Sequence, residues 1–160
     1  MRRKPAVFAI FAGGGVGGVL FILYMVIYAY AGGGRVPAYR ILQAVASGVL
    51  GGAAFEGGAL TAVLGLVLHL LIVTGMAAAF YGAGKVLRFL SRWPLLWGPL
   101  YGFGLYVLMY RLVLPRSAYP FPVAILPWSY FYANALAHMG LGLVIALAAW
   151  FARRRSPGSA

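Results

Sequence analysis

The chain has almost no acidic residues and no cysteine, and each absence excludes a class of chemistry. Among 160 residues a single one is acidic, Glu56, whereas 13 are Lys or Arg. With one carboxylate and no Ser–His–Asp set, the chain lacks the acid and base groups on which hydrolases depend. Without cysteine it has no disulfide, no thiolate nucleophile and no iron–sulfur site. We therefore expect a protein that is not an enzyme.

Charged residues of either sign are also scarce. They make up 9% of the chain, against about 25% in an average soluble domain. Hydrophobic residues reach 64%, and the mean hydropathy is +0.93. Too few polar groups remain to cover a surface that faces water, so the composition indicates a single membrane domain over 1–160. The net charge of +12 comes in short clusters without a basic helix, which favours lipid headgroups and not nucleic acid as the partner.

Four segments are long and apolar enough to cross a bilayer, which takes about 20 residues of helix. They predict an all-α polytopic fold, a four-transmembrane-helix bundle with spans over about 6–31, 58–82, 94–114 and 128–151. Residues 41–57 are apolar but short and broken by glycines. They predict a short helix over about 39–50 on the outer face, either interfacial or re-entrant.

Small residues and basic residues both have a meaningful distribution. The run GGGVGG at 13–18 predicts a face on which helix backbones come close together. The two termini and the loop between the second and third spans carry nine cations, and the two opposite loops carry four. Because cytoplasmic segments are rich in Lys and Arg, both termini are expected in the cytoplasm. The chain then reads as a multi-pass protein of a bacterial inner membrane.

Both histidines lie inside predicted spans. His69 follows Gly58 by 11 residues and His138 follows Trp128 by 10, which at about 1.5 Å per residue puts both imidazoles about 15–17 Å below the outer boundary. Asn134 precedes His138 by one helical turn and shares its face. Ionisable groups at such depth are rare and are functional candidates by default.

Three interpretations of these histidines stay open. Two imidazoles at one depth suit a haem with two axial histidines, and one alone suits a chlorophyll-type magnesium. A hydrogen bond to Asn134, Tyr106 or a backbone carbonyl is the structural alternative. A proton relay or ligand site is the third. Two histidines are too few for a closed zinc site, so no metal centre is expected.

Glu56 is expected at the outer end of the second span, 13 residues from His69 and so about 20 Å away along a helix. There it favours the positive end of the helix dipole. Arg111, at the outer end of the third span, is its expected ion-pair partner, with Arg40 and Arg116 as alternatives.

Two stretches, "ASGVLGGAAFEGGALTAVLGLVLHLLIV" and "LPWSYFYANALAHMGLGL", carry a resemblance. Over about residues 40–150 the chain resembles small bacterial four-span inner-membrane proteins, the YagU family among them. The likeness rests on a histidine in the second span, an outer loop ending in Leu-Pro-Trp and a histidine in the fourth span. It implies a helical bundle, singles out His69 and His138, and supplies no substrate.

Three functions follow as hypotheses. The first is an accessory or scaffolding subunit of a larger membrane complex or a homo-oligomer, which suits the glycine-rich faces and the lack of catalytic groups. The second is a haem- or chlorophyll-binding subunit for electron transfer or light harvesting that uses His69 and His138. The third is a small transport or stress-response protein with a path near the histidines.

Overall fold

The structure, a computed structural model, describes residues 5–31, 36–121 and 128–154. Of these residues, 92% are helical and none lies in a strand, which confirms the predicted all-α class. Within the described part, three helices are long and apolar enough to cross a membrane: Pro5–Ala31, Gly58–Val86 and Trp128–Arg154. They fall on the first, second and fourth predicted spans.

The first long helix changes pitch where its sequence is richest in glycine. It consists of α1 (Pro5–Phe11), a π-helical turn (Ala12–Val16) and α2 (Gly17–Ala31). A Cβ on Gly14 would come within 2.7 Å of Thr74, and one on Gly17 within 2.8 Å of Leu141. The glycine run therefore brings this helix into close contact with two others, as predicted from GGGVGG.

A short helix precedes the second long one and lies directly on it. The helix α3 (Ala38–Leu50) is followed by a 3₁₀ turn (Gly51–Phe55) and by α4 (Gly58–Val86). A Cβ on Gly65 would overlap the carbonyl group of Leu42. The amide of Gln43 donates to the carbonyl of Gly58 at 2.9 Å and to the hydroxyl of Thr61 at 3.2 Å. Backbone contact and buried hydrogen bonds thus join α3 to the start of α4.

The predicted third span has a different form from the other three. A short helix, α5 (Arg88–Arg92), leads into α6 (Pro94–Leu108), a π-helical turn (Met109–Val113) and α7 (Leu114–Arg116). Helical backbone is continuous over 94–116, but the uninterrupted α-helix has only 15 residues. Since a bilayer needs about 20, the third predicted span, over 94–114, and with it the total of four spans, stays a prediction.

The last helix, α8 (Trp128–Arg154), packs along α6 in the most extensive helix–helix contact among the described residues. Two glycines of α6 face the backbone of α8. A Cβ on Gly98 would meet Leu143, and one on Gly102 would overlap the carbonyl of His138. Gly142 on α8 faces Gly98 and Gly102 in turn. Three glycines therefore allow the two backbones to touch.

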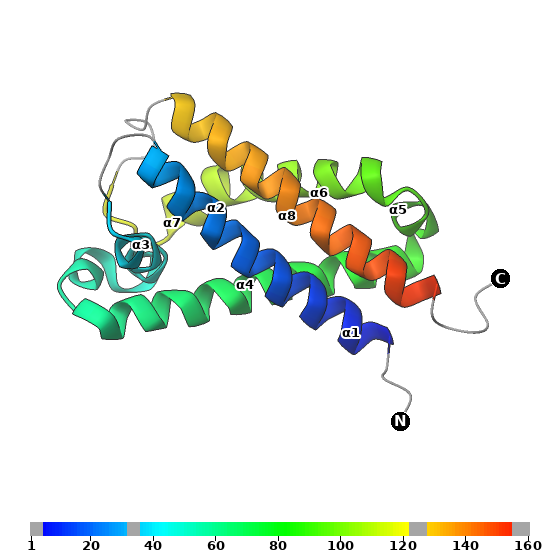
Figure 1. Ribbon diagram of the computed structural model, residues 1–160, viewed down its shortest axis with the longest axis horizontal. Coiled ribbons are helices and arrows are strands. Elements are labelled where there is room, and N and C mark those ends of the chain that lie inside the picture. Colours follow the sequence, from blue (N-terminus) through cyan, green and yellow to red (C-terminus); the bar gives the residue numbers. More distant parts are fainter. Residues whose placement is uncertain (1–4, 32–35, 122–127, 155–160) are drawn as a thin grey trace.

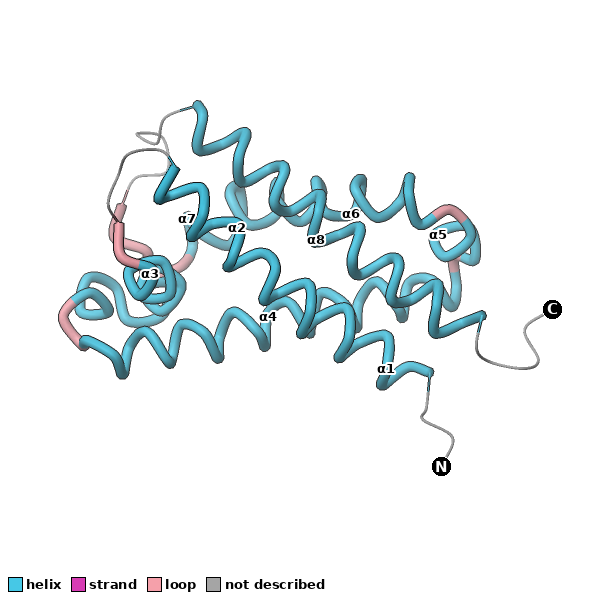
Figure 2. Tube along the Cα trace, viewed as in Figure 1, coloured by secondary structure: helices cyan, strands magenta, loops and turns pink. Residues whose placement is uncertain are grey.

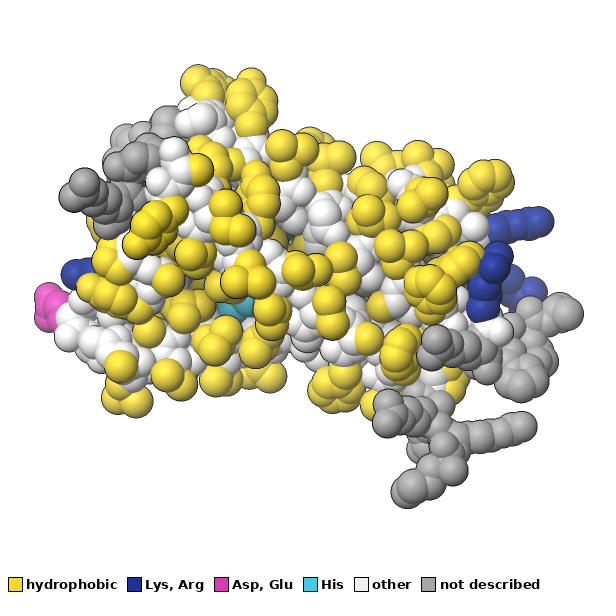
Figure 3. Space-filling view, in the orientation of Figure 1, with side chains coloured by type: hydrophobic (Ala, Val, Ile, Leu, Met, Phe, Trp, Pro, Cys, Tyr) yellow, Lys and Arg dark blue, Asp and Glu magenta, His cyan; other side chains and the backbone are white. Residues whose placement is uncertain are grey.

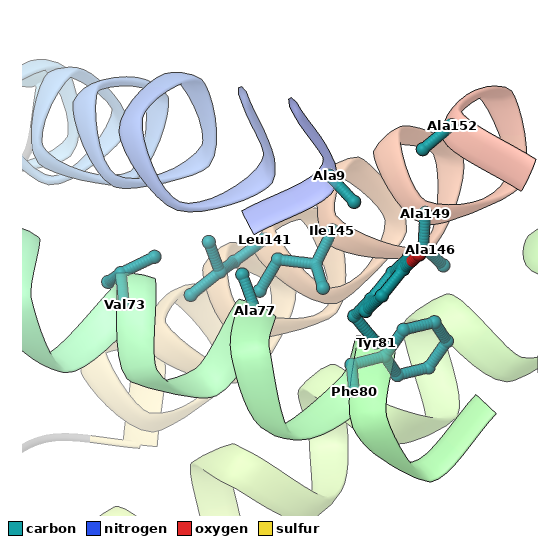
Figure 4. Close-up of a cluster of buried hydrophobic side chains, with 10 residues drawn as sticks. All are labelled: Ala9, Val73, Ala77, Phe80, Tyr81, Leu141, Ile145, Ala146, Ala149 and Ala152. Carbon is teal, nitrogen blue, oxygen red and sulfur yellow. The ribbon is translucent and has the colours of Figure 1, made fainter. Parts of the chain in front are cut away.

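The long helices lie side by side, with the short ones at the two ends (Figures 1 and 2). At one end are α1, α5 and the C-terminal end of α8, and at the other are α3 and α7. The main apolar core lies toward the α5 end and is built largely from alanine, with Phe80 and Ile145 as its largest buried side chains (Figure 4). Alanine allows close helix packing, and the larger open space lies in the other half of the bundle.

Candidate functional site

The two histidines lie in that other half and border one cavity. His69 on α4 is 7% exposed and His138 on α8 is 6% exposed. The ring nitrogen Nε2 of His69 donates to the carbonyl oxygen of Gly18 on α2 at 3.0 Å. The ring nitrogen Nδ1 of His138 donates to the carbonyl oxygen of Asn134, one turn earlier, at 2.7 Å. Among the open alternatives, each histidine therefore has a backbone carbonyl as its partner.

An aromatic side chain that the sequence did not single out lies against both imidazoles. The ring of Phe21 is 5.4 Å from that of His69 and 4.8 Å from that of His138, in an edge-on arrangement with the latter. Tyr106 makes a second edge contact with His138, at 5.7 Å between ring centroids. Phe21 is three residues after Gly18 and four after Gly17, so it continues the glycine face of α2. That spacing is the signal from which its position was predictable.

Asn134 shares the face of His138, but its side chain does not hydrogen-bond the ring. It is 4% exposed, and its side-chain amide donates to the carbonyl oxygen of Tyr130 at 3.0 Å. The backbone carbonyl of Asn134 accepts the hydrogen bond from the ring of His138. The pattern is the same three times: a buried polar side chain donates to helix backbone and keeps an acceptor atom for the cavity.

The cavity has a volume of about 310 Å³, within the range of sites for small molecules. Its walls come from α2, α3, α4, the π-helical turn after α6, α7 and α8. Most of the lining is aliphatic. The polar groups are few: His69, His138, Asn134, Tyr110, Tyr119, Tyr130 and Ser117. Sequence reasoning missed the three tyrosines and the contribution of α3, because neither has a pattern that reports a shared cavity.

Each imidazole donates one ring N–H to a backbone carbonyl and keeps its other nitrogen, which is also the arrangement of a histidine that ligates a metal. The ring of Phe21 lies against both imidazoles. Within the described residues, no group of three or more His, Cys, Asp or Glu gathers to hold a metal ion.

Comparison of the chain with protein-family models, with curated proteins and with solved structures found no match. The site is therefore interpreted from its own residues.

Glu56 and Arg111 lie away from the cavity and are both exposed. Glu56 is just before α4, as expected, but no ion pair joins it to a cation in the described part of the chain. Arg40, one of its expected partners, donates instead to the carbonyl oxygen of Phe55 at 2.9 Å and lies over the ring of that residue. An exposed ion pair gains little free energy, so nothing holds Glu56 against one arginine.

Proposed function

We propose that this chain is a non-enzymatic accessory subunit of the bacterial cytoplasmic membrane, which crosses the bilayer four times and packs against a helix of another membrane-protein chain. The three long apolar helices support membrane insertion. The remaining span is the third predicted one. Its unbroken helical backbone over 94–116 reaches roughly 35 Å at 1.5 Å per residue, enough to cross the hydrocarbon core. The antiparallel contact of α6 with α8 is in accord with this.

Charge at the two ends of the bundle supports the orientation. Dark blue side chains cluster at the α5 end, and the single acidic side chain lies at the opposite end (Figure 3). The described cations of the first end are Lys85, Arg88, Arg92, Arg153 and Arg154, and those of the other are Arg40, Arg111 and Arg116. The remaining basic residues lie outside the described ranges. By the enrichment of Lys and Arg on the inside, the α5 end is cytoplasmic.

In this orientation α3 lies at the outer end, as an interfacial helix. Its 13 residues reach only roughly 20 Å, too short to span. The turn after it is tight, because Gly51 and Gly58 adopt positive φ of 60° and 56°.

The observation that carries the proposed partner is one face of α4. Gly75, Ala79 and Gly82 are exposed on the same side of the helix, and a Cβ on either glycine would meet nothing within 4 Å. Toward the outer end, the same side carries larger residues such as Leu64 and Leu71. Lipid tails pack equally well on leucine, whereas small residues three and four apart let a second helix approach closely. The face therefore suits another transmembrane helix.

Measurement of particle mass in mild detergent tests this function. We expect the purified protein to be larger than one copy, either as a homo-oligomer or with a co-purified membrane protein. The double substitution Gly75→Leu with Gly82→Leu is expected to return it to one copy. Gly104→Leu, at an equally open glycine on α6, is the matched control and should leave the mass unchanged. A wild-type protein that is a stable single copy would overturn the proposal.

A further inference from the structure

The cavity between α2, α4 and α8 has a hydrogen-bonding character that limits what it binds. A carbonyl oxygen only accepts, so the ring nitrogen that faces it must carry the proton. The neutral imidazole of His69 then keeps its lone pair on Nδ1, and that of His138 keeps its lone pair on Nε2. Both free ring nitrogens are acceptors that need a donor.

Neither acceptor has a partner in the described part of the molecule. The hydrogen bonds of both rings go to backbone through the other nitrogen, and both rings border the cavity. The side-chain oxygen of Asn134 is a third acceptor at the same place, since its amide nitrogen faces Tyr130. These three atoms can take hydrogen bonds from an occupant of the cavity that their residues line, so together they favour a ligand that donates.

The rest of the wall selects an apolar body. Ile22 and Met25 of α2, Val45 of α3, and Ile72 and Met76 of α4 line the cavity. No acidic residue is among the described lining residues, and Glu56 lies elsewhere. A cation would be buried without a countercharge. At the histidines a carboxylate or ketone would set acceptors against acceptors, since the hydroxyl groups of the wall belong to other residues, Tyr110, Tyr119, Tyr130 and Ser117. A neutral hydroxyl group on an apolar frame meets both requirements.

The way in faces the lipid. Figure 3 shows histidine surface at the bottom of a hollow among apolar side chains on the long side of the bundle. The long sides are covered by exposed apolar residues and the charges lie at the ends. A molecule dissolved in the bilayer therefore reaches the imidazoles without crossing a charged surface.

We infer that this cavity binds a neutral, membrane-soluble molecule whose hydroxyl group donates to the free nitrogen of His138, with the free nitrogen of His69 and the side-chain oxygen of Asn134 as further acceptors. The chemistry is shared by quinols and by aliphatic alcohols. Phe21 presents an aromatic edge next to the bound head group. This inference does not depend on the α4 face or on the number of spans.

Nitrogen NMR on histidine-labelled protein tests it directly, because only four ring nitrogens are observed. The probes are a short-tailed benzoquinol under argon, its quinone, 1-decanol and decane, each in nanodiscs. We expect the benzoquinol, the decanol or both to shift the unprotonated nitrogen of at least one ring. A benzoquinol that binds should bind roughly tenfold more tightly than its quinone, and a decanol that binds should bind roughly tenfold more tightly than decane, because only the first of each pair has a donor.

The outcomes separate cleanly. A response to benzoquinol alone assigns an aromatic source, and a response to decanol alone assigns an aliphatic one. Equal affinity for the members of both pairs, or no shift with any probe, overturns the inference. The variant His138→Phe keeps a ring next to Phe21 and should lose the preference for the hydroxyl. If that variant does not fold, the wild-type spectra still decide, and Tyr30→Phe at an exposed site is the control.

Discussion

The Nε2–H of His69 donates to the carbonyl oxygen of Gly18 at 3.0 Å, and this bond joins α4 to α2 inside the bundle. A Cβ on Gly18 would lie at ordinary contact distance, 3.6 Å, from the same nitrogen and closer, at 3.1 Å, to Cδ2 of Leu70, so the two helices are close at this point. The histidine thus has a structural role on one nitrogen, and the other nitrogen is left for the cavity.

Removal of this bond should weaken the bundle measurably. Hydrogen bonds between transmembrane helices average about 0.6 kcal/mol and reach about 1.7 kcal/mol, so His69→Leu should lower the free energy of unfolding by about 1 kcal/mol. Equilibrium unfolding in detergent, followed by circular dichroism, measures it. Leu71→Val, on the same helix but 63% exposed, should change stability by less than about 0.5 kcal/mol. Equal effects of the two substitutions would contradict the role given to His69.

Addition of a single methyl group at Gly102 should disrupt the contact between α6 and α8 and lower the stability of the protein. In Gly102→Ala the new Cβ would overlap the carbonyl of His138, which is backbone and cannot rotate away. We expect a loss of stability of about 1–3 kcal/mol or more, as for an overpacked core.

The matched control is two residues further along the same helix. Gly104 has nothing within 4 Å of its Cβ position, so Gly104→Ala should be neutral or slightly stabilising through its better helix propensity. Thermal unfolding of the two variants side by side gives the comparison. If Gly102→Ala were as stable as Gly104→Ala, the backbone contact of α6 with α8 would be wrong.

The attachment of α3 to α4 depends on Gly65 in the same manner. Gly65→Ala would place a Cβ on the carbonyl of Leu42, so α3 should detach or shift. Hydrogen exchange measured by mass spectrometry should then increase over α3 and stay unchanged over α8. Gly75→Ala, at an open position of the same helix, should leave α3 as protected as in the wild type.

The absence of cysteine makes the orientation simple to measure. Single cysteines in place of Glu56, Ala118 and Arg88, all exposed, each give one labelling site. A maleimide that does not cross membranes should label the first two in intact cells after outer-membrane permeabilisation. It should label the third only after the cytoplasmic membrane is opened. Labelling of position 88 from outside would reverse the proposed topology.

Composition and run length were enough to predict the helical class and three long apolar helices, because membrane insertion depends on summed hydrophobicity. The rise per residue predicted His69 and His138 at a similar depth, and the structure shows that both border one cavity. The rotation of each helix about its axis was not predictable in the same way. It depends on which glycine meets which backbone, as Gly102 meets His138.

The spacing from Gly17 and Gly18 was enough to put Phe21 on the glycine face of α2, but it did not tell that this face meets both imidazoles. Arg40 illustrates a second limit of the sequence. Opposite charge led us to predict that an arginine pairs with Glu56. In the structure Arg40 donates to the backbone carbonyl of Phe55 instead. Opposite charges predict a pair only when burial removes the competing acceptors, and the outer end of α4 is exposed.

The backbone of α3 contacts that of α4 at Gly65, with no side chain between them. This contact affects how the proposed occupant enters and leaves the cavity. Residues of α3 line the cavity at the end that the proposed orientation places outside, and a wall made by touching backbones does not swing open as a loop would. Exchange of an occupant then takes place sideways, within the bilayer. Occupancy will follow the mole fraction of the occupant among the lipids, and dilution of the surrounding buffer will leave it unchanged.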